Sequence, residues 1–225
     1  MYEALLKATP EYQKVAASFG SAGPAALFGL PPAGRALLYA ALQKDLGRVL
    51  CIVTPGEAEA THFADDLKAL GLTAAVFPPR DFMLRPVEGA GREYRRLSVL
   101  GALAGGRLQA VCVPAEALLQ YTVPRAEFIQ NTLTLKPGMV YNREALVARL
   151  FAAGYVRRSQ VDGPGQFSVR GDIVDIYAPD MRQPARVEYW DDEIDSMSSF
   201  DLLTQRRDGA LEKIYLSPAR EVLFG

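Results

Sequence analysis

The chain has 225 residues, which is enough for one large domain or two small ones around a buried core. Hydrophobic residues make up 49% and charged residues 23% of the sequence, a balance that excludes a disordered tail, a coiled coil and a collagen-like repeat. Because 25 lysines and arginines stand against 26 aspartates and glutamates, the formal net charge is -1, and we expect no global basic field that would steer the chain onto nucleic acid.

The first part of the chain alternates predicted strands and helices. Strands are predicted at Ala25–Phe28, Val49–Val53, Ala74–Phe77 and Leu108–Val113. Helices are predicted at Ala36–Leu46, Glu57–Leu70, Gly91–Leu103 (with a basic outer face) and Pro114–Gln120. The continuous apolar run Val49–Val53 indicates a strand that is buried on both faces. Strict alternation of strand and helix predicts an α/β domain with an open, mostly parallel sheet over residues 1–132.

After about Leu133 the pattern changes to one helix followed by several strands. The helix is predicted over Asn142–Ala152, with Asn142 as its N-cap. The strands are predicted at Val156–Val161, Gln166–Val169, Ile173–Tyr177, Arg186–Trp190 and Ile194–Phe200. This order predicts a smaller α+β domain over residues 133–208. We interpret the last apolar run, Leu211–Leu216, as a strand in segment 209–225 that returns toward the first sheet.

A Gly/Pro-rich stretch before the first long helix has the glycine spacing of a P-loop, G-x-x-x-x-G-K-[ST]. In a working P-loop the backbone N–H groups and the lysine hold phosphates, and the Ser/Thr hydroxyl binds Mg²⁺. Here Gly29 and Gly34 keep the spacing, but Arg35 stands at the lysine position and Ala36 at the hydroxyl position. Two prolines also remove N–H donors from the loop. The stretch is either an ordinary Gly/Pro loop or a degenerate P-loop. In either case, these residues argue against nucleotide binding.

No other catalytic or metal-binding pattern is present in the sequence. His62 has no cysteine near it in sequence, and Cys51 and Cys112 lie in apolar runs, where a free cysteine behaves as a small hydrophobe. The acidic run Asp191–Glu193 is interpreted as a hairpin turn rather than a metal site. We expect no catalytic residue, no metal and no cofactor. Two cysteines, no long apolar run and no signal peptide predict a soluble, cytoplasmic protein with no membrane partner.

Charge is segregated along the second domain. From Lys136 to Arg170 six basic residues stand against two acidic ones, whereas every charged residue from Glu188 to Asp201 is acidic. The pattern fits either a binding surface for a charged partner or a solvated face with internal ion pairs, and charge alone favours neither.

An ordered series of motifs in the second domain resembles a known family. The segments Gly165–Tyr177 and Arg186–Ser196, followed by Phe200-Asp201, Thr204–Arg206 and Pro218–Glu221, are similar to the UvrB-homology module of bacterial transcription-repair-coupling factors. The resemblance is strong from about Leu133 to Glu221 and weaker but collinear before it. It implies an N-terminal fragment with a degenerate P-loop, helicase-like first domain and a UvrA-binding second domain.

UvrB itself shares the second domain, so a fragment of a UvrB-type ATP-dependent DNA-repair helicase is the alternative. UvrB has an intact P-loop and a long aromatic-rich hairpin that clamps damaged DNA. This chain has Arg35-Ala36 in the loop and only the short segment Phe77–Phe82 in place of the hairpin. Both departures favour the coupling factor.

The resemblance implies a non-catalytic adaptor that recruits UvrA to stalled transcription complexes in nucleotide excision repair. The full-length protein would be an ATP-dependent DNA translocase that also binds RNA polymerase and double-stranded DNA. Arg157, with its neighbour Arg158, matches an arginine of UvrB that contacts UvrA, and Arg170 matches the arginine of its V-R-G motif. Phe167 matches an aromatic position that is either core or interface, and Ser168 stands where UvrB has another arginine.

Overall fold

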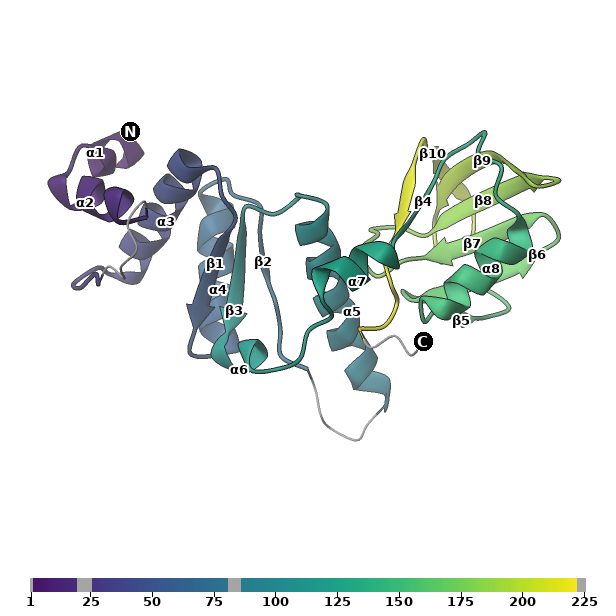
Figure 1. Ribbon diagram of the computed structural model, residues 1–225, viewed down its shortest axis with the longest axis horizontal. Helices are drawn as coiled ribbons and strands as arrows, with labels where there is room; N and C mark the ends of the chain where they lie inside the picture. Colours follow the sequence, from purple (N-terminus) through teal and green to yellow (C-terminus); the bar gives the residue numbers. More distant parts are fainter. Residues whose placement is uncertain (1, 20–25, 81–85, 222–225) are drawn as a thin grey trace. The chain divides into compact units, whose positions relative to one another are not determined.

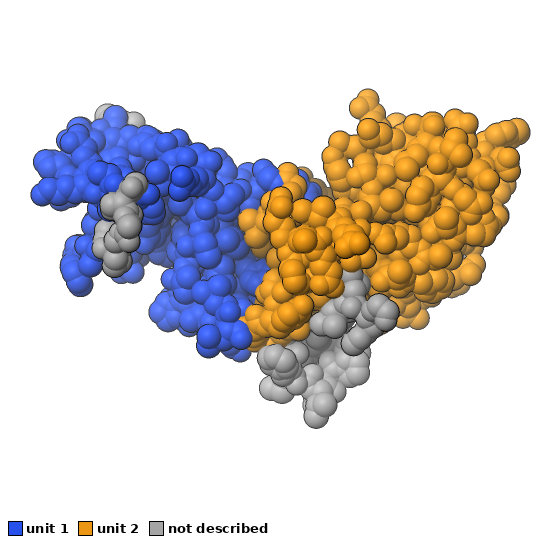
Figure 2. All heavy atoms as spheres, in the orientation of Figure 1, with its two compact units in different colours: residues 1–79, 106–119 blue, residues 80–105, 120–225 orange. Residues whose placement is uncertain are grey.

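The structure is a computed structural model that describes residues 2–19, 26–80 and 86–221, with only the backbone described for residues 86–90. The chain forms two compact units, which Figure 2 colours separately. Unit 1 contains residues 1–79 and 106–119, and unit 2 contains residues 80–105 and 120–225. Both units are therefore built from discontinuous stretches of the sequence.

Unit 1 is built around a parallel sheet (Figure 1). Its elements are α1 (Tyr2–Lys7), α2 (Pro10–Ser18), α3 (Pro32–Leu46), β1 (Leu50–Thr54), α4 (Glu57–Ala69), β2 (Ala74–Val76), β3 (Ala110–Pro114) and α6 (Ala115–Leu118). The strands pair in the order β1-β3-β2, and all of them are parallel. Ala60, Ala64 and Leu67 form one stripe of α4 because they are three or four positions apart, and this stripe packs against the sheet residues Ile52 and Cys112.

Two helices that sequence analysis did not predict, α1 and α2, precede this sheet. The Thr9 hydroxyl oxygen caps α2 by accepting the N–H of Tyr12 at 3.2 Å. Tyr12 is buried with Leu38 and Leu42 of α3, and its hydroxyl donates to Asp45 at 2.5 Å. Burial, together with the hydrogen bond to Asp45, raises the pKa of Tyr12 to about 12. These contacts hold α2 against α3.

Two predictions in unit 1 were wrong. The strand predicted at Ala25–Phe28 does not form: Ala25 lies outside the described residues, and Ala26–Phe28 have no regular structure, with Phe28 90% exposed. Strand β1 forms but is not buried on both faces, since Val53 is 54% exposed and Cys51 is exposed as well. The physical reason is that β1 lies at an edge of a three-stranded sheet, where α4 covers only one face.

Unit 2 contains a six-stranded sheet with a helix across one face (Figure 1). Its elements are α5 (Pro86–Ala104), α7 (Arg125–Gln130), β4 (Leu133–Leu135), α8 (Arg143–Ala152), β5 (Val156–Arg157), β6 (Gln166–Arg170), β7 (Ile173–Tyr177), β8 (Ala185–Trp190), β9 (Glu193–Phe200), β10 (Arg207–Ala210) and β11 (Ile214–Leu216). The strand order is β10-β9-β8-β7-β6-β5, and every pair is antiparallel except β5 with β6.

Helix α8 and the six-stranded sheet form the main core of unit 2. The predicted N-cap is confirmed, because the Asn142 side-chain oxygen accepts the N–H of Ala145 at 3.1 Å. Leu146 and Leu150 lie four residues apart on one side of α8 and are fully or almost fully buried. They pack into the same cluster as Phe167 of β6, so α8 is held on the sheet by its apolar stripe.

The two faces of this sheet differ in chemistry. Paired residues on neighbouring strands share a face, so Phe167 lies with Ile176 and Ser168 lies with Asp175. We call the face with Phe167 and Ile176, which belongs to the core, the inner face. We call the face with Ser168, Asp175 and Arg170 the outer face. Strand alternation thus produces one apolar and one polar face, and α8 covers the apolar one.

The compact units do not follow the predicted ranges 1–132, 133–208 and 209–225, because α5 and residues 120–132 pack with unit 2. Arg96 of α5 is 0% exposed, and its Nε and Nη2 atoms each contact a carboxylate oxygen of Glu221 at 2.8 Å. The Nε atom of Arg80 adds a contact with the same carboxylate at 3.0 Å. The basic outer face predicted for this helix is therefore incomplete. Glu221 is 125 residues from Arg96, so the helix pattern could not reveal the partner.

The predicted return of the last apolar run to the first sheet was also wrong. Strand β11 pairs antiparallel with β4, with Ile214 opposite Leu135 and Leu216 opposite Leu133. Ile214, Leu216 and Leu135 are buried in the core of unit 2. The described residues thus form a mixed α/β protein with three sheets. Among those residues, no helix combines the length and apolar character that a membrane crossing requires.

Candidate docking surface

The stretch from Gly29 to Ala36, which has the glycine spacing of a P-loop, differs in structure from a phosphate-binding loop. Helix α3 already begins at Pro32, so Gly34, Arg35 and Ala36 are all helical residues. Ala36 is only 1% exposed, and the Nε atom of Arg35 donates to the carbonyl oxygen of Leu30 at 3.2 Å. In this arrangement Arg35 turns back onto its own loop, and the Ala36 side chain has no oxygen that could bind a metal ion.

The acidic run between β8 and β9 is a hairpin turn, as predicted. Trp190 pairs with Glu193 across the turn, and Asp191 has the left-handed φ of 57° that tight hairpin turns favour. The Nδ2 atom of Asn142 donates to Asp192 at 2.7 Å, which ties the turn to the start of α8. Within the described residues, no group of three or more His, Cys, Asp or Glu side chains is placed to hold a metal ion.

Arg157 and Arg158 lie at the edge of the six-stranded sheet, and we call these two residues the β5 edge. Strand β5 consists of Val156 and Arg157 and pairs in parallel with β6. The N–H of Arg158 donates to the carbonyl oxygen of Phe167 at 2.8 Å, so it continues the ladder. Both arginine side chains are exposed, and neither forms an ion pair or hydrogen bond within the described part of the chain.

Phe167 and Ser168, on the neighbouring strand, are buried. Phe167 is 0% exposed, and its ring meets that of Phe151 edge to face, with centroids 5.1 Å apart. Of the two roles that the sequence left open for Phe167, the structure therefore assigns the core role. Ser168 is 1% exposed, and its Oγ atom has no hydrogen-bond partner among the described residues.

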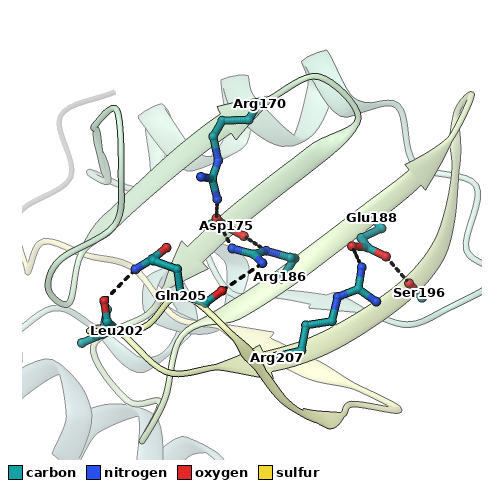
Figure 3. Close-up of polar contacts among 8 residues, drawn as sticks. All are labelled: Arg170, Asp175, Arg186, Glu188, Ser196, Leu202, Gln205 and Arg207. Atoms are coloured by element: carbon teal, nitrogen blue, oxygen red, sulfur yellow. Dashed lines mark hydrogen bonds and ion pairs between the residues drawn. The ribbon is translucent and has the colours of Figure 1, made fainter.

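Arg170 ends β6 on the outer face, where it joins a cluster of ion pairs (Figure 3). Its Nη2 atom contacts Oδ2 of Asp175 at 2.5 Å, yet its side chain is 48% exposed. Asp175 is buried and also accepts from Arg186, at 2.7 Å from Nε and 3.0 Å from Nη2. The hydrogen bond to Asp175 raises the pKa of Arg186 above its ordinary value. Sequence analysis missed both partners, although a carboxylate inside the apolar strand Ile173–Tyr177 is a signal that a buried charge needs a counter-charge.

The predicted contact residues do not all lie on one face. Arg157 pairs in register with Phe167, so its side chain leaves from the inner face, whereas Arg170 leaves from the outer face. Arg157 is nevertheless exposed, since β5 is the last strand of the sheet. A single surface that includes both arginines must wrap over the β5 edge.

Comparison with known proteins identifies this region. The family model described as the UvrB interaction domain matches residues 133–222, a range that includes all strands of unit 2. The transcription-repair-coupling factor of Bacillus subtilis (strain 168) is 29% identical over 202 residues, or 88% of this chain and 17% of the relative. That of Myxococcus xanthus is 33% identical over 207 residues, or 87% and 17%, and that of Staphylococcus aureus (strain MRSA252) is 27% identical over 224 residues, or 98% and 19%. The chain is similar to the transcription-repair-coupling factors over most of its own length.

The resemblance to transcription-repair-coupling factors is confirmed beyond the UvrB interaction domain. The Staphylococcus aureus factor matches 98% of the chain, so the similarity extends through unit 1. The chain spans less than a fifth of the length of these relatives, at 17% to 19%.

The segregated charges of the second domain are only partly paired. Arg143 of α8 contacts Asp172 at 2.8 Å, and Arg207 of β10 pairs with Glu188. For these residues, internal ion pairs explain the charge pattern. The two arginines of the β5 edge differ, because no described residue pairs with them. The two interpretations of the charge pattern thus apply to different parts of the UvrB interaction domain.

Proposed function

We propose that the chain is the N-terminal, non-catalytic adaptor module of a transcription-repair-coupling factor, and that it recruits the UvrA damage sensor to stalled transcription complexes. The observation that carries the proposal is the UvrB interaction domain at residues 133–222, in which the β5 edge presents two exposed arginines that no described residue pairs. The relatives are transcription-repair-coupling factors, and this supports the same role.

The alternative role, a UvrB-type ATP-dependent helicase subunit, requires nucleotide binding. The turned-back Arg35 and the buried Ala36 weigh against it. We therefore propose that this chain binds no nucleotide and catalyses no reaction by itself. In a longer coupling factor, ATP-driven translocation on double-stranded DNA and binding of RNA polymerase would belong to other parts of the protein.

We place the UvrA contact at the β5 edge and on the adjoining outer face. Arg157 and Arg158 offer planar guanidinium groups that match carboxylates, and Arg170 adds a third from the end of β6. Arginine is enriched among residues that dominate binding energy at protein interfaces. Phe167, being fully buried, supports this surface by fixing β6 against Phe151 and does not itself touch the partner.

Two substitutions test the proposal. Arg157→Ala and Arg170→Ala should each weaken UvrA binding by at least roughly thirtyfold, which corresponds to about 2 kcal/mol for an arginine hot spot. Because the Arg157 side chain is exposed and has no described partner, Arg157→Ala should change the free energy of unfolding by less than about 0.5 kcal/mol. Isothermal titration calorimetry with purified UvrA measures binding, and thermal melts of each variant measure folding.

Two other exposed arginines serve as matched controls. Arg48 lies in unit 1, and Arg182 lies in the β7–β8 connection, at the opposite end of the sheet from Arg170. Alanine at either position should leave UvrA binding unchanged. The proposed surface is wrong if Arg157→Ala and Arg170→Ala bind UvrA like the parent, or if all four variants lose the same affinity.

A further inference from the structure

We propose that Asp175 is a positioning residue for Arg170, and that the cluster of Arg170, Asp175 and Arg186 recognises a carboxylate group of UvrA. The inference rests on the proposed function and specifies how the outer-face part of that surface works. It follows from a shared carboxylate, from the charges on the outer face and from the exposure of the three side chains.

One buried carboxylate serves two arginines. Arg186 contacts both oxygens of Asp175, at 2.7 Å and 3.0 Å. Arg170 contacts Oδ2 of the same carboxylate at 2.5 Å. The cluster thus holds two positive charges and one negative charge, so it remains positive after its internal pairing.

The acidic side chain in the neighbouring row position does not neutralise this excess. Glu188 lies in the same cross-strand row as Arg170, on the other side of Ile173. Its carboxylate is already engaged by Arg207 and by the hydroxyl of Ser196, which donates at 2.9 Å. A cluster with two guanidinium groups and one carboxylate fits an anionic partner group, and a guanidinium fork favours a carboxylate.

The exposure of the three side chains shows which of them can reach a partner. Asp175 is 1% exposed, Arg186 is 12% exposed and Arg170 is 48% exposed. A guanidinium has five N–H donors, so Arg170 can hold Asp175 with part of the group and bind a partner with the rest. An arginine that is already fixed loses less rotamer freedom on binding. This pre-organisation contributes about three- to tenfold in affinity.

A double-mutant cycle tests the positioning role. UvrA binding is measured by calorimetry for Arg170→Ala, for Asp175→Asn and for the double variant. Asp175→Asn alone should weaken binding about three- to tenfold, and it should cause no further loss when Arg170 is already alanine. In an Arg157→Ala background the same change should keep its full effect, because Arg157 leaves from the other face of the sheet.

The outcomes separate this inference from the proposed function. The positioning role is wrong, while UvrA docking stands, if Arg170→Ala weakens binding and Asp175→Asn does not. It is equally wrong if Asp175→Asn costs the same affinity with and without Arg170. If neither Arg157→Ala nor Arg170→Ala weakens binding, the docking proposal itself fails.

A second pair of variants tests the chemistry of the partner group. Arg170→Glu and Arg170→Gln have side chains of almost the same shape and differ in charge. Arg170→Glu should bind UvrA at least about tenfold more weakly than Arg170→Gln, because it sets a carboxylate against a carboxylate. Equal losses would show that the partner group is not anionic.

Nuclear magnetic resonance of the unaltered protein covers the case in which Asp175→Asn does not fold. The ion pair should slow rotation of the Arg170 guanidinium, so that its Nη atoms give separate signals, whereas exposed Arg157 should give one averaged signal. Loss of the signals in Arg170→Lys and Arg157→Lys assigns them. An averaged Arg170 signal like that of Arg157 overturns the positioning role.

Discussion

Two cysteines on neighbouring strands have opposite environments. Cys51 of β1 pairs with Val111, and Cys112 of β3 pairs with Ile52, so the two thiols leave opposite faces of the sheet. Cys51 is exposed, whereas burial raises the pKa of Cys112 to about 11. The prediction that both behave as small hydrophobes is confirmed for Cys112 and wrong for Cys51. An apolar run cannot show that one face of an edge strand is open.

Thiol labelling should distinguish the two cysteines. The thiolate is the reactive form, and with a pKa of about 11 only about one Cys112 thiol in a thousand is ionised at a pH of about 8. The folded protein should therefore show one fast-reacting thiol, and the second should react only after unfolding. The fast phase should vanish in Cys51→Ser and persist in Cys112→Ser. Two fast thiols in the parent protein would contradict this assignment.

At the candidate site, local sequence patterns indicate which arginine side chains are exposed better than they indicate which carboxylates pair with them. The motif that matched Arg157 and Arg170 located two side chains that reach solvent, and their role in UvrA binding stays a prediction. The ion pairs of Asp175 with Arg170 and Arg186 depend on strand register. The first pair spans the β6–β7 turn and the second spans the β7–β8 connection, and register across both is set in the folded sheet, so no local period reveals these pairs.

At the scale of elements, a buried ion pair ties α5 to the end of the described chain. Removing one partner of such a pair leaves an uncompensated buried charge and costs about 3–5 kcal/mol. Glu221→Gln leaves both Arg96 and Arg80 without their carboxylate. Since a chain of this size loses about 2–4 °C per kcal/mol, we expect the melting temperature to fall by about 10 °C in differential scanning calorimetry.

Glu144→Gln is the matched control for that variant. Glu144 contacts Arg143 at 3.0 Å, but its side chain is 68% exposed, so the pair is screened by water. Its loss should therefore lower the melting temperature far less than the loss of the Glu221 carboxylate does. If Glu144→Gln and Glu221→Gln melt at the same temperature, the buried pair does not hold α5 in place.

Elements with strong local signals were predicted well, and elements that depend on partners were not. The N-cap at Asn142 fixed the start of α8, and β7 forms over Ile173–Tyr177 as predicted. The strand predicted at Val156–Val161 shortens to Val156–Arg157, because the ladder with β6 continues only briefly. The segment at Ala26–Phe28 is apolar enough for a strand but forms none.

At the scale of the whole molecule, each compact unit is held together by contacts between segments that are far apart in the sequence. Residues 80–105 belong to unit 2, whereas the next residues, 106–119, return to unit 1. Tyr94 of α5 packs on Gly165, where φ is +74° and an added Cβ would lie 2.4 Å from the Tyr94 hydroxyl. The matched range 133–222 therefore covers only part of unit 2, and α5 completes it.

Nucleotide binding by the whole chain can be measured from thermal melts. A ligand that binds only the folded state at 100 times its Kd adds about 2.7 kcal/mol, which would raise the melting temperature by about 5–10 °C. Pro31 and Pro32 supply no N–H group, Arg35 turns back onto Leu30, and Ala36 is buried. Melts with and without millimolar ATP and Mg²⁺ should therefore superimpose.

The double variant Arg35→Lys with Ala36→Thr shows whether side chains or backbone prevent binding. It restores the lysine and the hydroxyl of the P-loop pattern but keeps both prolines and the helix start at Pro32. Because position 36 is only 1% exposed, the new hydroxyl would point into the core and could not reach a metal ion. We expect no ATP-dependent shift in this variant either. A shift in the variant alone would mean that the backbone is still a competent phosphate loop, and a shift in the parent would revive the helicase alternative.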